Sequence, residues 1–320
     1  MNRLFWNLIW PSLASAKMEH LEALDGNDLY EPTVLDVLVV RAMINKAFGL
    51  APELVDAVID AAEYWPHSTV IGDYRQLQGG MKAAVGSSSR GSKNLFLARS
   101  QPLGFARHPA GADPQAWAEE EPKPIQLQKE HPREKLQDLA KCPLTLVEHP
   151  CRKIVFTIHS RDQGWGGNVQ DHGTYKSSFT WFDAGLERFE AGDGVSASAP
   201  ALDASELRSI WPEVRTNEQG EQYIHADLLS DPEHLVQFNL LAAARVMKHR
   251  VEWSYLDDID PQSTEAAESL ERVGRGTNSV DGKFVRSLKL GDVVTLWARA
   301  RFAGWQNRVQ RVQMDVYWVV

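Results

Sequence analysis

The clearest pattern in the chain is an alternation of apolar and polar residues in its C-terminal half. Segments with this period of two lie at 153–159, 178–182, 236–240, 250–255, 293–302 and 312–318. Successive side chains of a strand point to opposite faces of a sheet, so clean alternation indicates antiparallel strands with one buried face. We therefore expect each sheet to keep its other face, including Arg299 and Arg301, in water.

Turn signals separate these segments. Glycine, alone or beside aspartate, stands at Gly164, Gly185, Asp281-Gly282, Gly291-Asp292 and Gly304. Several short strands with such spacing are typical of a sandwich of two antiparallel sheets. The pattern predicts a mainly β protein, with a jelly-roll-like β-sandwich over residues 142–320. Its expected core includes Phe156, Trp253, Leu296 and Val316.

A different period marks residues 33–68. Thr33 is a plausible N-cap, apolar residues follow at helical spacing, and Gly49 ends the run. A second helix starts at Pro52 and places Leu54 and Val58 on its apolar face. We expect a hairpin of two helices, which is too small to bury a core of its own. It must dock on the sandwich or on a partner.

The remaining segments show no convincing periodicity. Residues 69–141 contain the linker-like run 86–92 and the charged, proline-punctuated run 118–124. We expect an irregular, disordered linker there, with a strand-like patch at 94–98, and a disordered leader over residues 1–32.

The N-terminus allows several interpretations of where the protein resides. The apolar run before Ala14-Ser-Ala16 imitates a signal peptide, although Asn7 interrupts it, and Met18 is an alternative start. No stretch approaches the roughly 20 apolar residues of a membrane helix. The chain has no Asn-X-Ser/Thr sequon, and its two cysteines, Cys142 and Cys151, favour reduced thiols over one bridge. A cytoplasmic location is expected, with a nuclear or a secreted protein as alternatives.

The charge balance argues against nucleic acid as a partner. The formal net charge is -9 and the pI is about 5.6. Because binding to a nucleic acid backbone needs a concentrated basic face, and Lys and Arg are scattered among acids, nucleic acid is rejected as a default partner. No membrane is expected as a partner either.

Two loop clusters combine a tryptophan with glycine and polar side chains. They are Ser160–Gly167, continued by Gly173–Ser178, and Phe302–Asn307. A tryptophan face supplies flat apolar area, and nearby polar groups fix the orientation of a sugar or peptide. The candidate ligand-binding residues are Arg161, Asp162, Trp165, Tyr175, Trp305 and Asn307. In the competing interpretation, Asp162 bonds its own turn and the tryptophans plug the end of the sandwich.

Catalytic and metal-binding signatures are absent from the sequence. It has no Gly-X-Ser-X-Gly elbow, phosphate-binding glycine loop, His-Glu-X-X-His or Cys-X-X-Cys. His159 and His172 lack a ligand spacing, so no metal and no cofactor is predicted. An enzyme with a motif-free site stays open, with Asp162, His172 and Tyr175 as its first candidates.

Two resemblances extend this picture. Arg161-Asp-Gln-Gly-Trp165, Gly173-Thr-Tyr175, Thr180-Trp-Phe182 and Leu296–Phe302 resemble a group of filamentous-fungal proteins that has no assigned activity. The run Gly49-Leu-Ala-Pro-Glu-Leu54 is similar to the start of an F-box, although Ala51 replaces the usual leucine. A galactose-binding-like sandwich after it resembles the recognition half of F-box proteins.

Three functions follow as hypotheses. The first is a non-catalytic intracellular module that binds a protein or carbohydrate through loops 160–178 and 302–308. The second, implied by the F-box resemblance, is a ubiquitin-ligase adaptor whose Leu54, Val58 and Trp65 contact a Skp1-like scaffold. The third is the motif-free enzyme.

Overall fold

Two antiparallel sheets form the body of the protein in the computed structural model, which describes residues 30–87, 93–106, 113–140, 148–191 and 202–320. Sheet A contains β1 (His67–Asp73), β2 (Lys82–Val85), β4 (Cys151–Arg161), β10 (Met247–Ser254) and β12 (Gln306–Trp318). Sheet B contains β3 (Lys93–Arg99), β5 (Thr180–Phe189), β6 (Leu207–Trp211), β9 (Leu235–Phe238) and β11 (Val293–Ala300). A separate ribbon pairs β7 (Val214–Thr216) with β8 (Gln222–Ile224). The predicted fold class, an antiparallel β-sandwich, is confirmed.

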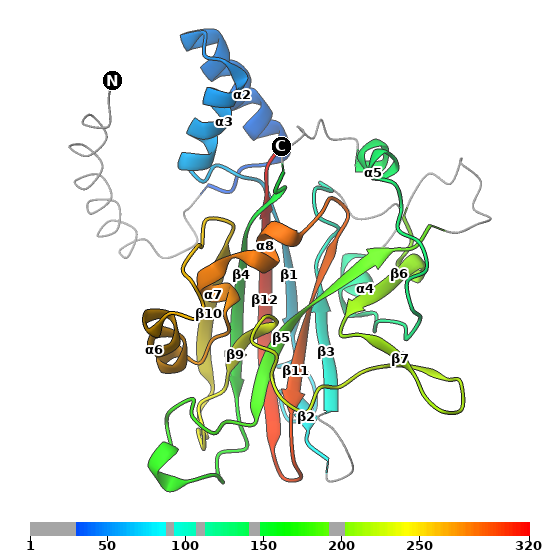
Figure 1. The fold of residues 1–320 in the computed structure, drawn as a ribbon, viewed down its shortest axis with the longest axis vertical. Coiled ribbons are helices and arrows are strands. Elements are labelled where there is room, and N and C mark those ends of the chain that lie inside the picture. Colours follow the sequence, from blue (N-terminus) through cyan, green and yellow to red (C-terminus); the bar gives the residue numbers. More distant parts are fainter. Residues whose placement is uncertain (1–29, 88–92, 107–112, 141–147, 192–201) are drawn as a thin grey trace.

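In each sheet, one long strand pairs with two shorter strands, each along a different part of its length. In sheet A, with order β1-β12-β4-β10, the strand β12 pairs with β1 along one half and with β2 along the other. In sheet B, with order β3-β11-β5-β6, the strand β5 pairs with β9 and then with β6. Figure 1 shows these strands running along the long axis of the molecule.

The core lies between the two sheets and contains the expected residues. Phe156 and Trp253 of sheet A are fully buried, as are Leu296 of sheet B and Val316 of the last strand. Burying one such side chain stabilises a fold by roughly 1.5–3 kcal/mol. The period of two in the sequence therefore assigned the inward face correctly.

The predicted helical hairpin is also present, as α2 (Val34–Phe48) and α3 (Pro52–Ala61). Thr33 and Asp36 form a capping box at the start of α2, and Gly49 ends it with φ +61°, a conformation that glycine adopts without strain. Val37, Val55 and Ile59 belong to the same core as the sandwich. The hairpin therefore docks on its own chain (Figure 1).

The segment 69–141, predicted as an irregular linker, differs in the structure. It contains most of β1, all of β2 and β3, and the helices α4 (Pro114–Glu119) and α5 (Arg133–Ala140). These strands are short and lie at sheet edges, paired with β11 and β12, whose residues lie about 200 to 250 positions later in the chain. The predicted strand-like patch 94–98 is confirmed as part of β3. Short edge strands carry little periodicity of their own, so the pattern did not reveal β1 and β2.

The expectation of one wet face per sheet is wrong for sheet B. Arg99 pairs with Glu187 at 2.8 Å and Arg299 pairs with Asp183 at 2.9 Å, and all four side chains are buried on the outer side of this sheet. Trp117 of α4 and Trp211 of β6 lie over the two guanidinium groups. Alternation reports two chemically different faces, and here the polar face is covered by other parts of the chain.

Three further helices connect β10 to β11, where the sequence indicated only loops. They are α6 (Thr264–Val273), α7 (Asn278–Asp281) and α8 (Lys283–Ser287). Short 3₁₀ turns occur at Val169–Asp171 and Ala204–Glu206. Within the described ranges, no helix combines the length and apolarity that crossing a membrane requires. Residues 1–29 of the predicted leader, and Cys142, lie outside those ranges.

Candidate functional site

A cavity of about 370 Å³ opens at the end of the sandwich that carries α5 and the C-terminus, which we call the cavity end. Its walls come from the start of α5, the end of β5, the turn 288–292 before β11, and residues just before β4 and after β12. The opposite end, which carries loop 162–179 and the β11–β12 turn, is called the loop end (Figure 1). The cavity therefore lies at the other end of the sandwich from the loops that the sequence predicted.

Apolar side chains make up much of the cavity wall. They are Leu136, Pro150, Phe189, Leu288, Leu290 and Val319. Leu288 and Leu290 are buried beside it, and Leu136 of α5 is half-buried. A hollow of 300–1,000 Å³ with apolar walls and a few fixed polar groups is typical of small-molecule sites.

The turn 288–292 holds α5 in place over this hollow. Gly291 has φ +83°, and a Cβ at this position would lie 3.0 Å from Leu136 Cδ1. Asp292 Oδ2 accepts a hydrogen bond of 2.9 Å from the backbone N–H of Lys289, which closes the turn. The sequence Lys289-Leu-Gly-Asp292 thus forms a tight turn on which Leu136 packs.

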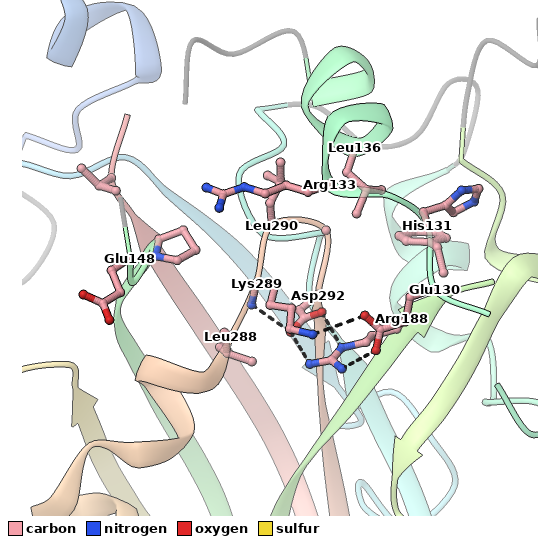
Figure 2. A pocket seen from close by; sticks show the side chains of 14 residues that line it. Glu130, His131, Arg133, Leu136, Glu148, Arg188, Leu288, Lys289, Leu290 and Asp292 are labelled. Carbon is pink, nitrogen blue, oxygen red and sulfur yellow. Dashed lines mark hydrogen bonds and ion pairs between the residues drawn. The ribbon is translucent and has the colours of Figure 1, made fainter. Parts of the chain in front are cut away.

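One wall carries four charges that neutralise one another, and we call them the ionic tetrad: Glu130, Arg188, Lys289 and Asp292. Arg188 lies 2.7 Å from Glu130 and 2.9 Å from Asp292, and Lys289 Nζ lies 3.3 Å from Glu130 (Figure 2). Burial favours a higher pKa for Glu130, but Arg188 and Lys289 outweigh it and lower the pKa. Burial likewise favours a lower pKa for Arg188, and its two carboxylates raise it instead. Both groups are therefore held charged.

Two further groups at the cavity have unused hydrogen-bonding capacity. The structure shows no ion pair between Arg133 and any described carboxylate, and its guanidinium extends away from the tetrad (Figure 2). Both ring nitrogens of His131 are buried without a partner among the described residues. Burial, followed by the charge of Lys135, lowers the pKa of His131, so the neutral ring is favoured. Glu148, across the cavity, directs its carboxylate away from the tetrad (Figure 2).

The chemical groups that face the cavity can be read from its described lining residues. They include no serine, threonine, cysteine or tyrosine, so no common hydroxyl or thiol nucleophile faces the hollow. Two of its carboxylates are engaged in the tetrad. Nowhere in the described ranges do three His, Cys, Asp or Glu side chains gather in a way that could hold a metal ion.

At the loop end, the structure buries two of the predicted ligand-binding residues. Asp162 is fully buried and accepts hydrogen bonds from the backbone N–H groups of Gly164 (2.7 Å) and Ala242 (2.6 Å). Asn307 is fully buried, donates to the carbonyl of Trp181 at 2.8 Å and accepts from Asn239 at 2.9 Å. Both side chains hold loop and strand together in this structure.

Two other predicted residues, the tryptophans, lie closer to the surface. Trp165 is 64% exposed, and its ring reaches the β11–β12 turn, where a Cβ at Gly304 would lie 3.4 Å away. Trp305 is half-buried with its ring edge-on to Phe179 at 5.1 Å. Neither residue lines the cavity, and Trp165 presents an exposed aromatic face.

Arg161 and Tyr175 complete the predicted loop site. Arg161 is half-buried at the end of β4, opposite Arg308 of β12. Tyr175 packs against Gly274, where a Cβ would lie 2.4 Å from the ring, and edge-on to His249 at 6.0 Å. Its ring therefore lies beside α6, away from the β11–β12 turn where Trp165 lies.

The three residues considered for a motif-free enzyme take separate partners. Asp162 bonds backbone amides, His172 Nε2 lies 3.0 Å from the Gly166 carbonyl, and Tyr175 packs on Gly274. The structure shows no hydrogen bond between any two of these described side chains. Cys151 is a buried free thiol, and burial raises its pKa to about 12, which leaves it an unreactive thiol at neutral pH.

The hairpin residues predicted to bind a partner divide into two groups. Leu54 and Val58 are 55% and 46% exposed on α3, whereas Trp65 is only 2% exposed. Trp65 Nε1 donates to Asp60 at 2.8 Å, and Asp60 pairs with Arg152 of β4 at 2.9 Å. Trp65 therefore anchors the hairpin to the sandwich and offers no surface to a partner.

The cavity has little signal in the sequence. Its lining residues come from segments that are far apart in the chain, and the start of α5 falls in the predicted linker. The one local hint is the turn signal Gly291-Asp292, which was assigned only to a strand boundary. Comparison of the chain with protein-family models, curated proteins and solved structures finds no match.

Proposed function

We propose that this protein is a non-catalytic binding module whose cavity takes a small amphipathic molecule with an apolar body and an anionic group. The carrying observation is the cavity itself: it stays open although its charged wall is internally neutralised. The apolar walls would hold the ligand body. Arg133, which has no carboxylate partner among the described residues, would pair with the anionic group.

The neutral ring of His131 supports this assignment. A buried imidazole with no hydrogen-bond partner carries a desolvation cost that a ligand's polar group would relieve. The ionic tetrad also supports the proposal. Its cations, Arg188 and Lys289, are already paired with carboxylates, so they do not compete with Arg133 for the anionic group of the ligand. Specificity would then rest on Arg133 and His131, and affinity on the apolar walls.

Paired fluorescent probes test this proposal. Anilinonaphthalene sulfonate is an amphipathic anion, and N-phenylnaphthylamine has a similar apolar body without the charge. In the variant Arg133→Gln we expect affinity for the anion to fall about fivefold, the equivalent of about 1 kcal/mol, while the neutral probe is unaffected. The matched control Lys135→Gln changes the same helix by the same charge outside the cavity lining. Equal losses for both probes, or for both variants, would refute an anion site at Arg133.

A second candidate function, the ubiquitin-ligase adaptor, is favoured by the hairpin surface. Leu35, Val39 and Met43 recur at helical spacing on α2 and are 48–68% exposed, and Leu54 and Val58 of α3 are also exposed. Exposed apolar rows on helices are common docking surfaces. In the double variant Leu54→Gln/Val58→Gln, co-purification of a Skp1-like scaffold should be lost. The control Glu53→Gln, on the same helix, should retain it; retention by both variants would remove this candidate.

A further inference from the structure

The outer face of sheet A collects cations that the sequence scatters over three strands. The strand register places Lys248, His159 and Arg311 in one row across β10, β4 and β12, and Arg161 lies opposite Arg308 in the next row. Arg311 is opposite Asp73 of β1. We call Arg161, Lys248, Arg308 and Arg311 the basic face.

This face is positively charged in a chain whose net charge is -9. The structure shows no ion pair between the basic face and any described carboxylate; Arg308 bonds the neutral Gln306. Asp73, the nearest acid, is held by Arg75, and Glu252 is held by Arg250 at 3.0 Å. Burial and the charges of Lys248, Arg311 and Arg75 lower the pKa of His159, which reflects the crowding of cations there.

An acidic segment of the same chain precedes the hairpin. Between residues 18 and 31 the acids recur at every third position, as Glu19, Glu22, Asp25, Asp28 and Glu31, and no Lys or Arg interrupts them. Every third side chain falls on one side of a polyproline-II-like extended chain. The segment can therefore present its carboxylates as a single negative edge.

The described part of the chain brings this segment to the correct face. Glu31 Oε2 lies 3.6 Å from His67 Nε2, and the His67 ring stacks on Tyr317 at 4.6 Å. His67 is the first residue of β1 and Asp73 is its last, so the basic face begins roughly 20 Å further along the strand. Residues 19–30 reach well beyond that distance when extended, at about 3 Å per residue.

We propose that Glu19, Glu22 and Asp25 of this acidic segment lie across the basic face and pair their carboxylates with Arg161, Lys248, Arg308 and Arg311. The spacing supports this pairing. Three residues of an extended chain span about 9–10 Å, close to the roughly 9.6 Å between alternate strands such as β10 and β12. Exposed pairs are weak singly, and several acting together along one segment give a measurable, salt-sensitive contact.

A single-stranded nucleic acid is the main competing occupant, and the face suits it poorly. Such partners stack their bases on aromatic side chains between the cations. The two rows of the basic face contain Ala83, Asp73 and His159 besides the cations, and no Phe, Tyr or Trp. Charge alone is what this face offers, which matches an acidic peptide.

Carbodiimide cross-linking of the full chain at low salt tests the placement, since it joins a carboxylate to a lysine only where the two are in contact. Lys248 is the one lysine of the basic face. We expect peptides that link Glu19, Glu22 or Asp25 to Lys248, and their loss in Lys248→Arg. Mixing isotope-labelled with unlabelled chains shows whether a link is within one molecule. Links from this segment only to other lysines, or only between molecules, would overturn the proposal.

A competition measurement provides a second, independent test. The synthetic peptide 18–31 is titrated against the full chain and against Glu19→Gln/Glu22→Gln/Asp25→Asn/Asp28→Asn. We expect the neutralised chain to bind the peptide at least about tenfold more tightly, because the tethered segment no longer competes at millimolar effective concentration.

The matched variants for that titration separate the face from net charge. Adding Arg161→Glu/Lys248→Glu to the neutralised chain should abolish peptide binding, whereas adding Lys46→Glu/Arg272→Glu, the same charge change elsewhere, should not. Equal peptide affinity for the full and neutralised chains, or equal effects of both charge reversals, would contradict the proposal. A heparin fragment that binds the full chain as tightly as the neutralised chain would also overturn it, because the face would then be open to external polyanions.

Discussion

The two ends of the sandwich contain similar polar side chains and use them differently. At the loop end, Asp162 and Asn307 direct their hydrogen bonds to neighbouring segments of the chain, and both side chains are buried. At the cavity end, the ionic tetrad satisfies its own charges and leaves an apolar hollow open beside it. A binding site is thus indicated by the space that remains once the polar groups are satisfied, and residue types alone do not reveal it.

The largest expected effect is a loss of stability on substitution of Asp162 at the loop end. Asp162→Ala removes a buried carboxylate and leaves two backbone N–H groups without acceptors, so the free energy of unfolding should fall by about 3 kcal/mol. Chemical denaturation measures this change. The control Trp165→Ala, at a 64% exposed side chain, should stay within about 0.5 kcal/mol of the parent. If Trp165→Ala lost more stability than Asp162→Ala, the Asp162 side chain would not be holding the loop together and would be free to bind a ligand.

A smaller effect is expected at the cavity end. Arg188→Met leaves Asp292, which is buried, without its cation, and we expect a loss of about 2 kcal/mol in unfolding free energy. The double variant Arg188→Met/Asp292→Asn should recover part of it, because the amide oxygen of the new side chain can still accept from the N–H of Lys289. Strictly additive losses would show that the tetrad is not a coupled unit.

The pH dependence of stability separates the two ends further. Burial, then Arg275 and His159, lowers the pKa of His249 from 6.5 to about 4 beside Tyr175. Because the unfolded chain takes up this proton more readily, stability should fall by about 1.5 kcal/mol as pH drops from about 6.5 to 5. His249→Phe should flatten that slope, and an unchanged slope in this variant would contradict the assignment.

At the cavity end, the pKa of Glu130 is instead lowered by its cations. Its contribution to stability is therefore lost only in more acidic solution, as pH falls below the ordinary glutamate pKa.

The sequence predicted the features that depend on local periodicity. Alternation identified the central strands β4, β10, β11 and β12, and the cap at Thr33 and the stop at Gly49 bounded α2. It missed β1 and β2, and marked only the patch 94–98 within β3, because edge strands acquire their partners from residues about 200 to 250 positions away. It also did not show that the outer face of sheet B is covered, since alternation marks a polar face without saying what lies on it.

The candidate site was harder to predict for a related reason. Trp165 and Asp162 attract attention as residue types, whereas the cavity is lined by ordinary leucines and by charges that neutralise one another. Leu136 and Leu290 become a wall only when α5 folds onto the turn at Gly291, which is a tertiary contact. No spacing in the sequence encodes that contact.

Filling the cavity tests the central claim most directly. Leu136→Trp places a larger side chain in the hollow, and Leu139→Trp makes the same change on the same helix outside the cavity lining. Affinity for anilinonaphthalene sulfonate is measured by fluorescence titration for these two variants and for Trp165→Ala. We predict that Leu136→Trp weakens binding at least about tenfold, or about 1.4 kcal/mol, and that the other two bind like the parent. Undiminished binding in Leu136→Trp, with a loss in Trp165→Ala, would contradict the account and place the site at the loop end.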